Sequence, residues 1–439
     1  MRGKLLLLSA PVISLLIIAT TLYLRSTVPY QYPGGRASHA KPIHDLEPAW
    51  ELEHDDAPPR DSVVDGKVLP ASNITQYLDA ILTEKASALP TLQCPAMNQT
   101  RYEYMRASST SGPPIQYVFA LNLRQNLALL PRLLGSIVEA IRFLGPSHCA
   151  LSIVEGNSAD GTADVLAALR PGLEKLGITY HFKSSEIDPS ESKPARIVRL
   201  AQLRNMALEP MLVPGGPNHI SRTEDTTVIF LNDVCACVDD ILELVHQKKV
   251  TGADMTCAMD WTYVGRDPTF YDVWIARGIN GDSFFDIPAD GNWDSAWNLF
   301  WNAGETNERF SDLRPFQVFS CWNGAAAFSA APLVRDGIRF RAANETAGEC
   351  VQGEPQLFCK DLWHHGYGRI AVVPSVNLEY SVEKANMIKL AKGFTSDTVA
   401  AQDPAGDAID WRPEPPEKVK CMPSWANQFW QLWNETLRR

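Results

Sequence analysis

One acidic residue lies near the end of a long hydrophobic segment, where a ligand could bind at the edge of a β-sheet. Asp233 lies near the end of the apolar segment 226–234, which is typical of a buried strand. In open α/β sheets, ligands bind beyond the carboxyl ends of the strands. A nucleoside diphosphate bound there needs a hard cation to neutralise its oxygens, and carboxylate oxygens hold such cations. Asp233 is therefore the candidate ligand for a divalent metal.

Arg204 is the candidate partner for the diphosphate itself. It lies in the expected helix 194–209, which faces the same edge of the sheet, and a guanidinium can bind phosphate oxygens in a fork geometry. Both residues also have ordinary structural roles. An Asp after a strand commonly caps a helix or forms a turn, and an isolated Arg is more often part of a surface ion pair. Only their order along the chain favours the functional interpretation.

The elements that must position these residues alternate between strands and helices. We expect a further helix to open at 158–162. The other expected elements are strands at 116–123, 149–156, 178–185 and 226–234 and helices at 126–144 and 194–209. Such alternation is typical of an α/β domain with a mostly parallel sheet. The sequence therefore predicts an α/β fold with a mostly parallel central sheet.

The composition and the missing motifs exclude several classes of protein. The 439 residues carry 40 Lys and Arg against 51 Asp and Glu, a net charge of −11, which disfavours nucleic-acid binding. A chain with 45% hydrophobic and 21% charged residues is globular rather than disordered or collagen-like. No G-x-G-x-x-G follows the first strand, and no P-loop, G-x-S-x-G or H-E-x-x-H motif occurs. The sequence therefore lacks the signatures of dinucleotide-binding proteins, P-loop enzymes, serine hydrolases of this type and zinc proteases.

Residues 5–24 form an uncharged run of 20 residues, preceded by Arg2 and Lys4 and closed by Arg25. As a helix this run is about 30 Å long, the hydrocarbon thickness of a bilayer. A cleaved signal peptide is the alternative, but its apolar part usually has about 7–15 residues and ends in small residues, which are absent here. We therefore expect an uncleaved signal anchor, with residues 1–4 as a cytoplasmic tail and the body in the lumen.

Four sequons agree with a luminal body: Asn73, Asn98, Asn344 and Asn434. Each alone is a weak signal, and Asn434 lies close to the end of the chain. The nine cysteines show no paired C-x-x-C spacing for zinc, and their odd number implies at least one free thiol or an intermolecular bond.

Four of the cysteines have spacings that suggest an arrangement. Cys235 and Cys237 are two apart on an expected strand, and we interpret both as residues that pack in the core. Cys350 and Cys359 are close enough in sequence to pair, although the sequence does not give the connectivity.

The regions on either side of the α/β segment have a different composition. Residues 25–114 are expected to form a luminal stem, with seven prolines in 26–70 and a partly helical stretch, 72–107, that packs on the body. The catalytic domain is expected at 115–395. Residues 396–439 are expected to form a Pro-rich linker and a short amphipathic aromatic tail with Trp425, Trp430 and Trp433.

Residues 115–395 resemble the cryptococcal-type α-1,3-mannosyltransferases of glycosyltransferase family 69, the capsule-associated mannosyltransferases. The segments that carry this resemblance are FALNLRQN at 119–126, VEGNSADGT at 154–162, FLNDVCACVDDILELV at 230–245, FYDVWIARGINGDSFF at 270–285, FSCWNGAAAF at 319–328 and LFCKDLWHHGYGRIAVVPSV at 357–376. The resemblance implies a GT-A-like nucleotide-sugar transferase domain. It also implies a type II Golgi membrane protein that moves mannose from GDP-mannose to a mannoside with retention, using Mn²⁺ or another divalent cation.

The resemblance also suggests residues for the nucleotide sugar. The turn at 155–162 is similar to the family's base- and ribose-binding loop, which assigns nucleotide roles to Glu155 and Asp160; taken alone, it is an ordinary Asp-Gly turn that opens a helix. The broad GT-A metal motif is Asp-x-Asp, whereas this chain has Asn232 followed by Asp233. Asn232 is therefore expected to contribute an amide oxygen or to bind ribose.

A single carboxylate suggests weak metal binding or help from a remote ligand. His364 and His365 are candidates because neutral imidazole suits Mn²⁺. Adjacent residues on a helix point in different directions, so at most one of them is expected to reach the metal. A surface or core position is the ordinary alternative for both.

Glu354 is expected to be the carboxylate nearest the reacting carbon, because the order of segments from 353 to 374 follows that of the GT-A carboxylate, helix and final strand. In a retaining enzyme it would stabilise positive charge, act as a transient nucleophile or orient the acceptor. The alternative is that Glu354 caps the following helix, where the helix dipole favours negative charge.

The acceptor is expected to bind the tryptophan-rich region 260–301 together with the segment 322–324. Trp297 and Trp301 are spaced to share one face of a helix. The acceptor candidates are Asp272, Trp274, Arg277, Trp322 and Asn323. Core packing accounts for most aromatic rings of this kind. Two further functions stay open at this stage: the same fold with another donor, such as UDP-xylose or UDP-glucose, and a non-catalytic luminal carbohydrate-binding scaffold.

Overall fold

The computed structural model describes residues 63–83, 89–107, 114–190, 193–213, 215 and 219–437. The expected cytoplasmic tail, the expected anchor and most of the expected stem up to residue 62 lie outside these residues. Within the described part of the chain, no helix is both long enough and apolar enough to cross a bilayer.

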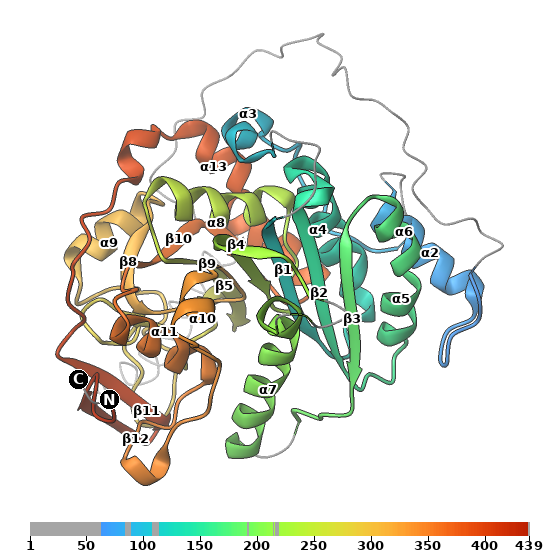
Figure 1. The fold of residues 1–439 in the computed structure, drawn as a ribbon. Coiled ribbons are helices and arrows are strands. Elements are labelled where there is room, and N and C mark those ends of the chain that lie inside the picture. Colours follow the sequence, from blue (N-terminus) through green and yellow to red (C-terminus); the bar gives the residue numbers. More distant parts are fainter. Residues whose placement is uncertain are drawn as a thin grey trace, which may run out of the picture. The chain divides into compact units, whose positions relative to one another are not determined.

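A ten-stranded sheet forms the centre of the fold (Figure 1). Its strands follow the order β3-β2-β1-β4-β9-β5-β10-β8-β7, and β6 pairs with β5 alone. The strands are β1 (Ile115–Leu123), β2 (Cys149–Gly156), β3 (Thr179–Ser185), β4 (Arg222–Leu231), β5 (Met255–Val264), β6 (Asp267–Phe270), β7 (Arg277–Gly278), β8 (Phe316–Ser320), β9 (Ala325–Ser329) and β10 (Ile370–Leu378).

The main strands run in one direction. β1 is parallel to both β2 and β4, and β3 is parallel to β2. β9 lies between β4 and β5 and is antiparallel to both, so β4 and β5 run in the same direction. β10 is parallel to β5. The predicted α/β class with a mostly parallel sheet is confirmed. The carboxyl ends of β1, β2 and β4 lie at the same edge of the sheet, where Leu123 pairs with Glu155 and Leu121 pairs with Leu231.

Helices cover both faces of this sheet. One core contains apolar residues from α2, α4, α5, α6 and α8, and a second core contains apolar residues from α7, α10 and α11. Figure 1 shows α4 and α8 on one side of the strands and α7 on the other. The helices are α2 (Ala71–Leu82), α3 (Gln99–Tyr102), α4 (Leu130–Leu144), α5 (Thr162–Ala168), α6 (Arg170–Lys175), α7 (Lys193–Leu212), α8 (Val238–Val250), α9 (Gly304–Ser311), α10 (Ala331–Arg335), α11 (Glu354–His364), α12 (Val382–Lys392) and α13 (Thr395–Ala401).

The pattern of buried apolar residues explains why the chain forms these strands and helices. Every residue of β2 is buried, as expected for a strand covered by helices on both faces, so its sequence is almost continuously apolar. In α4, Leu130, Leu133, Leu134, Ile137 and Ile141 recur at helical spacing and are all buried. The apolar stripe of α4 therefore packs on the sheet.

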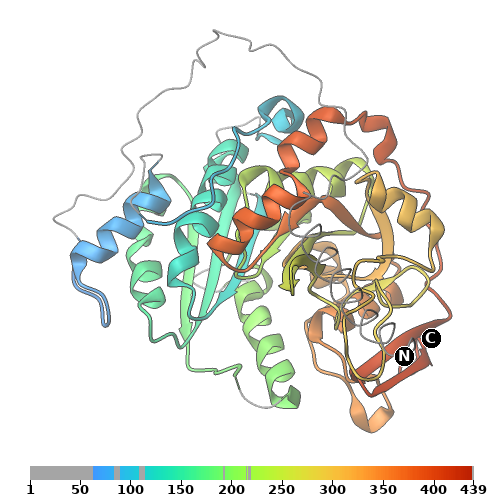
Figure 2. The same ribbon diagram turned by 180° about the vertical axis from the view of Figure 1, so that it is seen from behind.

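The segments outside the α/β core also have defined structure. α2 buries Ile74 and Leu78 and packs against α4, so this stretch of the expected stem contacts the body. The aromatic tail is a hairpin of β11 (Lys418–Ser424) and β12 (Asn427–Leu432), which lies far from α2 in both views of the molecule (Figure 2). The expected helix through Trp297 and Trp301 is wrong: these residues lie in turns before α9, and Trp297 is 81% exposed.

Three disulfides join distant parts of the chain: Cys94–Cys237, Cys257–Cys321 and Cys350–Cys421. Cys235 and Cys237 are both buried, as expected for core residues, but Cys237 forms a disulfide whereas Cys235 is a free thiol. Cys350 does not pair with Cys359, which is buried and free on α11. Three free thiols confirm the expectation of at least one.

Candidate active site

A buried ion pair lies at the centre of the candidate site. The Nε of Arg204 on α7 donates to Oε1 of Glu354, the first residue of α11, at 2.8 Å. Both side chains are almost fully buried. The guanidinium carbon lies 4.5 Å from the centroid of the Trp322 ring, so the ring packs against the cation. The pair fixes the carboxylate of Glu354 and the first turn of α11 against α7.

Asn232 connects this ion pair to the end of β4. Its Oδ1 accepts hydrogen bonds from Nη1 of Arg204 at 3.3 Å and from Nε1 of Trp322 at 3.0 Å. A carbonyl oxygen has two lone pairs, and here both are used. The amide oxygen of Asn232 is therefore occupied within the protein, where it holds Arg204 in place.

Asp233 lies next to Asn232 and has a neutral direct partner. Its Oδ2 accepts a hydrogen bond from Nδ2 of Asn126 at 3.1 Å, and burial raises the pKa of Asp233 above its usual range. The nearby positive charges of Arg204 and Arg196 partly oppose this rise. A half-buried carboxylate with no cation in direct contact among the described residues fits a divalent metal, which would offset the cost of its charge.

Asn126 is a site residue that the sequence interpretation did not assign. It follows β1, is buried, and its backbone N–H donates to Oγ1 of Thr162 at 3.0 Å. Its Oδ1 accepts from the N–H of Arg124 at 2.7 Å, which leaves its amide N–H₂ directed to Asp233. The segment 119–126 was among those that carry the family resemblance, but a lone Asn after a strand has no distinctive chemical signature.

Glu155 lies near the end of β2 and Asp160 lies in the loop that follows, and both carboxylates hold this loop. Glu155 is fully buried, and its carboxylate accepts from the backbone N–H of Ser158 at 2.5 Å and from Oγ of Ser184 at 2.9 Å. Asp160 accepts from the N–H of Leu127 at 3.0 Å. Both carboxylates shape the loop beside Asn126, and their contact with a nucleotide stays a prediction.

Two further carboxylates, Asp260 and Asp272, form an acidic pair near Asn323. Oδ2 of Asp260 on β5 accepts from the hydroxyl of Tyr380 at 2.5 Å, while its buried Oδ1 has no hydrogen-bond partner in the described structure. Oδ2 of Asp272 accepts from the backbone N–H of Asn323 at 2.9 Å. Burial raises the pKa of both carboxyls, that of Asp272 to about 6, and the charge of Asp272 raises that of Asp260 further. The pair therefore holds a proton more readily than isolated Asp residues.

The expected acceptor residues divide into two groups. Asp272, Trp322 and Asn323 lie together beside the Arg204–Glu354 pair, because Asn323 bonds Asp272 and Trp322 packs on Arg204. Trp322 and Asn323 are themselves almost fully buried. These contacts group the three residues next to the ion pair.

Trp274 and Arg277 face the C-terminal hairpin instead. Trp274 stacks on Trp425 with ring centroids 4.1 Å apart. Arg277 is fully buried and donates to the carbonyl oxygens of Lys420, Val273 and Ala276. In this structure Arg277 braces the hairpin, and its contact with an acceptor stays a prediction.

The two histidines do not join Asp233. They lie at the last residue of α11 and directly after it, whereas Glu354 begins the helix. His364 is ten residues after Glu354, which at about 1.5 Å per residue places it about 15 Å along the helix axis. His365 is exposed, and its Nδ1 lies 2.9 Å from the carbonyl oxygen of Asp361. The structure therefore gives no support to a metal contact from either imidazole.

Another group of possible metal ligands lies on the outer side of α8. Glu243, His246 and Asp407 are buried, and their ligand atoms lie within 4.8 Å of one another. Arg101 donates to both oxygens of Glu243 at 2.7 Å, and Arg314 donates to Asp407 at 2.8 Å. Two guanidiniums already compensate these carboxylates, so this cluster is a structural ion-pair network rather than a cation site.

A comparison of the sequence with known proteins shows the family to which the chain belongs. The sequence model of a family described as cryptococcal mannosyltransferase 1 matches residues 116–361, more than half of the chain. The chain belongs to this family. The chain is also 36% identical over 369 residues to the alpha-1,3-mannosyltransferase CMT1 of Cryptococcus neoformans var. neoformans serotype D. The match covers 81% of this chain and 75% of that protein, and the family member described here is therefore a glycosyltransferase.

Two solved structures show a more distant likeness to this family member. One is Staphylococcus aureus TarS 1–349, at 12% identity and a TM-score of 0.34, covering 66% of each chain. The other is the mannosyltransferase PcManGT of Pyrobaculum calidifontis in complex with GDP-Man and Mn²⁺, at 12% identity and a TM-score of 0.33. The second match covers 70% of this chain and 72% of PcManGT. The assignment of the site rests on the contacts of this chain's own residues.

Proposed function

We propose that this glycosyltransferase moves mannose from GDP-mannose to a mannoside acceptor and forms an α-1,3 linkage with retention of configuration. The observation that carries the proposal is the 36% identity to an alpha-1,3-mannosyltransferase, which extends over 81% of the chain. It spans the segments that hold Asp233, Arg204 and Glu354. The donor and the linkage are the parts of the proposal that transfer assays must test.

Such a transfer needs groups that bind the diphosphate and a group that stabilises positive charge at the anomeric carbon, and the residues at the sheet edge can fill these roles. Asp233 would hold Mn²⁺ or another divalent cation, which when bound neutralises the oxygens of the diphosphate. Arg204 would add positive charge beside the diphosphate, although its Nε already donates to Glu354. Glu354 would lie beside the anomeric carbon and oppose the positive charge that develops there. The buried Arg204, which Asn232 holds in place, fixes the direction of that carboxylate.

We further propose that the chain is a type II Golgi membrane protein, anchored by residues 5–24. Three disulfides support a luminal body, because such bonds persist in oxidising compartments. Asn73 and Asn344 are exposed and accessible to glycosylation, whereas Asn98 is half-buried. Alkaline carbonate extraction and glycosidase digestion test this proposal. Release into the soluble fraction, or unchanged mobility after deglycosylation, would contradict it.

A thermal-shift measurement on the full chain tests the donor site. GDP with Mn²⁺ is expected to raise the melting temperature, GDP without metal is expected to raise it less, and UDP is the matched control nucleotide. A shift with α-mannobiose alone and none with GDP and Mn²⁺ would instead indicate a carbohydrate-binding scaffold.

A further inference from the structure

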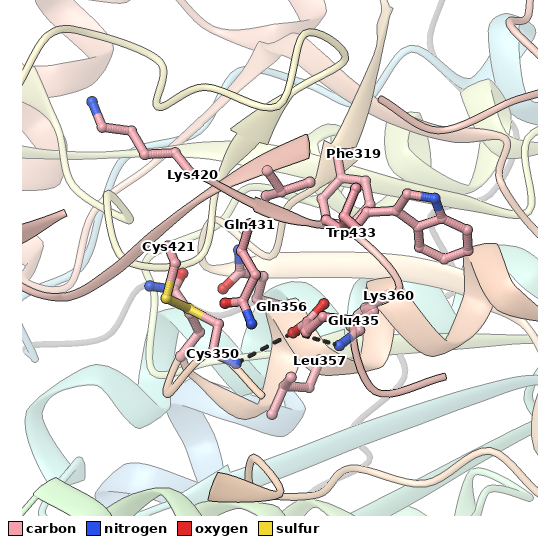
Figure 3. Close-up of a pocket in the computed structure, with 13 residues that line it drawn as sticks. Phe319, Cys350, Gln356, Leu357, Lys360, Lys420, Cys421, Gln431, Trp433 and Glu435 are labelled. Atoms are coloured by element: carbon pink, nitrogen blue, oxygen red, sulfur yellow. Dashed lines mark hydrogen bonds and ion pairs between the residues drawn. A yellow bond between two sulfur atoms is a disulfide. The ribbon is translucent and has the colours of Figure 1, made fainter. Parts of the chain in front are cut away.

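A small pocket, which Glu354 does not line, lies between the start of α11 and the C-terminal hairpin. Its volume of about 30 Å³ has room for one or two water-sized groups. Figure 3 shows Gln356, Gln431 and Lys360 around this space, with Trp433 beside it and Lys420 turned away. The disulfide Cys350–Cys421 forms part of the wall and joins the loop before α11 to the hairpin.

Three amide groups lining this pocket lack a hydrogen-bond partner on one atom. The unpartnered atoms, among the described residues, are Nε2 of Gln352, Oε1 of Gln356 and Oε1 of Gln431. Gln352 and Gln356 are only 4% and 6% exposed, so bulk water does not solvate these amides freely. Buried polar groups are nearly always hydrogen-bonded, because leaving them unpaired is costly. One donor and two acceptors that line the same pocket therefore indicate an occupant.

Other contacts determine how two of these amides are oriented. Oε1 of Gln352 accepts from Nη2 of Arg277 at 3.0 Å, which leaves its N–H₂ group to the pocket. Nε2 of Gln431 donates to the carbonyl oxygen of Gly348 at 2.7 Å, which leaves its Oε1 to the pocket. A flip of the Gln352 amide would place its N–H₂ group against the Arg277 guanidinium, and a flip of the Gln431 amide would place its oxygen against the carbonyl oxygen of Gly348. The observed orientations are therefore favoured.

The charges around the pocket are already paired. Nζ of Lys360 contacts Oε1 of Glu349 at 2.8 Å and Oε1 of Glu435 at 3.0 Å. An anion would lack hydrogens for the two glutamine oxygens, and a cation would lack an acceptor for Gln352. A neutral group that both donates and accepts hydrogen bonds satisfies all three amides. Hydroxyl groups have this property.

We propose that this pocket is a secondary carbohydrate site, which takes the hydroxyl-bearing edge of a neutral sugar. Adjacent hydroxyls donate to Gln356 and Gln431 and accept from Gln352. The half-buried Trp433 supplies an apolar surface beside them, as in many ligand pockets where aromatic side chains accompany a few polar groups.

This site is distinct from the reaction centre. Residues two apart on a helix point about 200° away from each other, so Gln356 faces away from the side of α11 on which Glu354 contacts Arg204. The site therefore holds a sugar of the glycan at a distance from the reacting hydroxyl. The choice of mannose as the ligand rests on the proposed function, whereas the existence of a sugar site does not.

Saturation-transfer NMR with the full chain in detergent tests the site, using α-1,3-mannobiose as the probe without nucleotide or metal. The wild type is expected to bind this disaccharide, and Gln356→Met and Gln431→Met are each expected to weaken binding at least tenfold. Gln402→Met is the matched control, because Gln402 is also a half-buried glutamine that donates to a backbone carbonyl, that of Asp312 at 2.8 Å. Its binding is expected to equal that of the wild type.

Binding and transfer report on different claims. Gln431→Met is expected to leave the rate of donor hydrolysis without acceptor unchanged. Wild-type binding in both pocket variants, or no disaccharide binding by a chain that still transfers mannose, would overturn the secondary site alone. Disaccharide binding that depends on Gln431 in a chain without transferase activity would support the secondary site and contradict the proposed function. A crystal soaked with mannobiose that shows only ordered water in the pocket would also overturn the proposal.

Discussion

Nε of Arg204 donates to Oε1 of Glu354 across 2.8 Å, joining two side chains that are 150 residues apart in sequence. The cap position of α11 is Gly353, and no side chain forms a capping hydrogen bond there. The pairing with a buried cation, rather than helix capping, therefore sets the position of the Glu354 carboxylate. A fixed carboxylate in a water-poor site is well placed to stabilise a developing positive charge.

Glu354→Gln should lower turnover by at least about a hundredfold, or roughly 2.7 kcal/mol in the barrier, with GDP binding retained. The amide keeps the shape of the side chain but loses the charge that opposes the developing positive charge. Steady-state transfer kinetics and GDP titration measure the two effects separately. Glu383→Gln is the control, because Glu383 is an exposed acid in the first turn of α12. Near-normal turnover of Glu354→Gln would remove Glu354 from the reaction.

Arg204→Met should lower the free energy of unfolding by about 3–5 kcal/mol, because it leaves Glu354 buried without its cation. The double variant with Glu354→Gln should recover part of this loss. Denaturant unfolding measures both. Arg335→Met is the matched control, because it breaks the exposed ion pair of Arg335 with Glu224 and should cost at most about 1 kcal/mol. Equal losses at Arg204 and Arg335 would mean that the central pair contributes no more than a surface contact.

Asp233→Ala should abolish the metal-dependent part of GDP binding. Stability should change by well under the roughly 2–5 kcal/mol of a core truncation, because the variant removes a carboxylate whose ionised form is disfavoured by burial. Calorimetric titration of GDP with and without Mn²⁺ provides the readout, and Asp267→Ala, at the exposed first residue of β6, is the control. Binding that still depends on Mn²⁺ in the Asp233 variant would place the metal elsewhere.

Asp272 should make stability depend on pH in the mildly acidic range. Burial raises the pKa of its carboxyl from 3.8 to about 6, so between these values the folded chain keeps a proton that the unfolded chain releases. Stability from this group is therefore lost as pH rises from about 4 to about 6 and is constant above that.

Asp272→Asn tests this dependence, since the amide keeps an oxygen for the backbone N–H of Asn323 but does not titrate. The melting temperature of the wild type minus that of the variant is expected to fall from pH 4 to pH 6 and then to level off. A difference that rises with pH, or stays flat, would contradict the raised pKa.

The sequence predicted the sheet well because its strands are buried on both faces. The expected range 149–156 agrees with the bounds of β2, and a short apolar run followed by a Gly-containing turn is typical of a strand that helices cover on both sides. Arg204 and Asn232 were expected to bind the nucleotide sugar and Glu354 to lie nearest the reacting carbon, and the structure brings Arg204 into direct contact with both of the others. The order of strands and helices was enough to place these residues at one edge.

Contacts between distant segments without a distinctive motif were not predictable. Asn126 contacts Asp233 across 107 residues of sequence, and a single amide after a strand has many possible roles. Cys94 pairs with Cys237 across 143 residues, which no local spacing reveals. The spacing of Trp297 and Trp301 suggested a helix, but Trp297 is mostly exposed, so there is little burial to stabilise one.

The initial rate of sugar transfer to α-mannobiose from a panel of donors tests the central claim most directly. The full chain, in detergent with Mn²⁺, would be given GDP-mannose, UDP-glucose and UDP-xylose in parallel. The account predicts transfer from GDP-mannose, an α-1,3-linked product by NMR, and at least a hundredfold lower rate in Glu354→Gln. Transfer from a UDP-sugar but not from GDP-mannose, or equal rates in the wild type and Glu354→Gln, would contradict it.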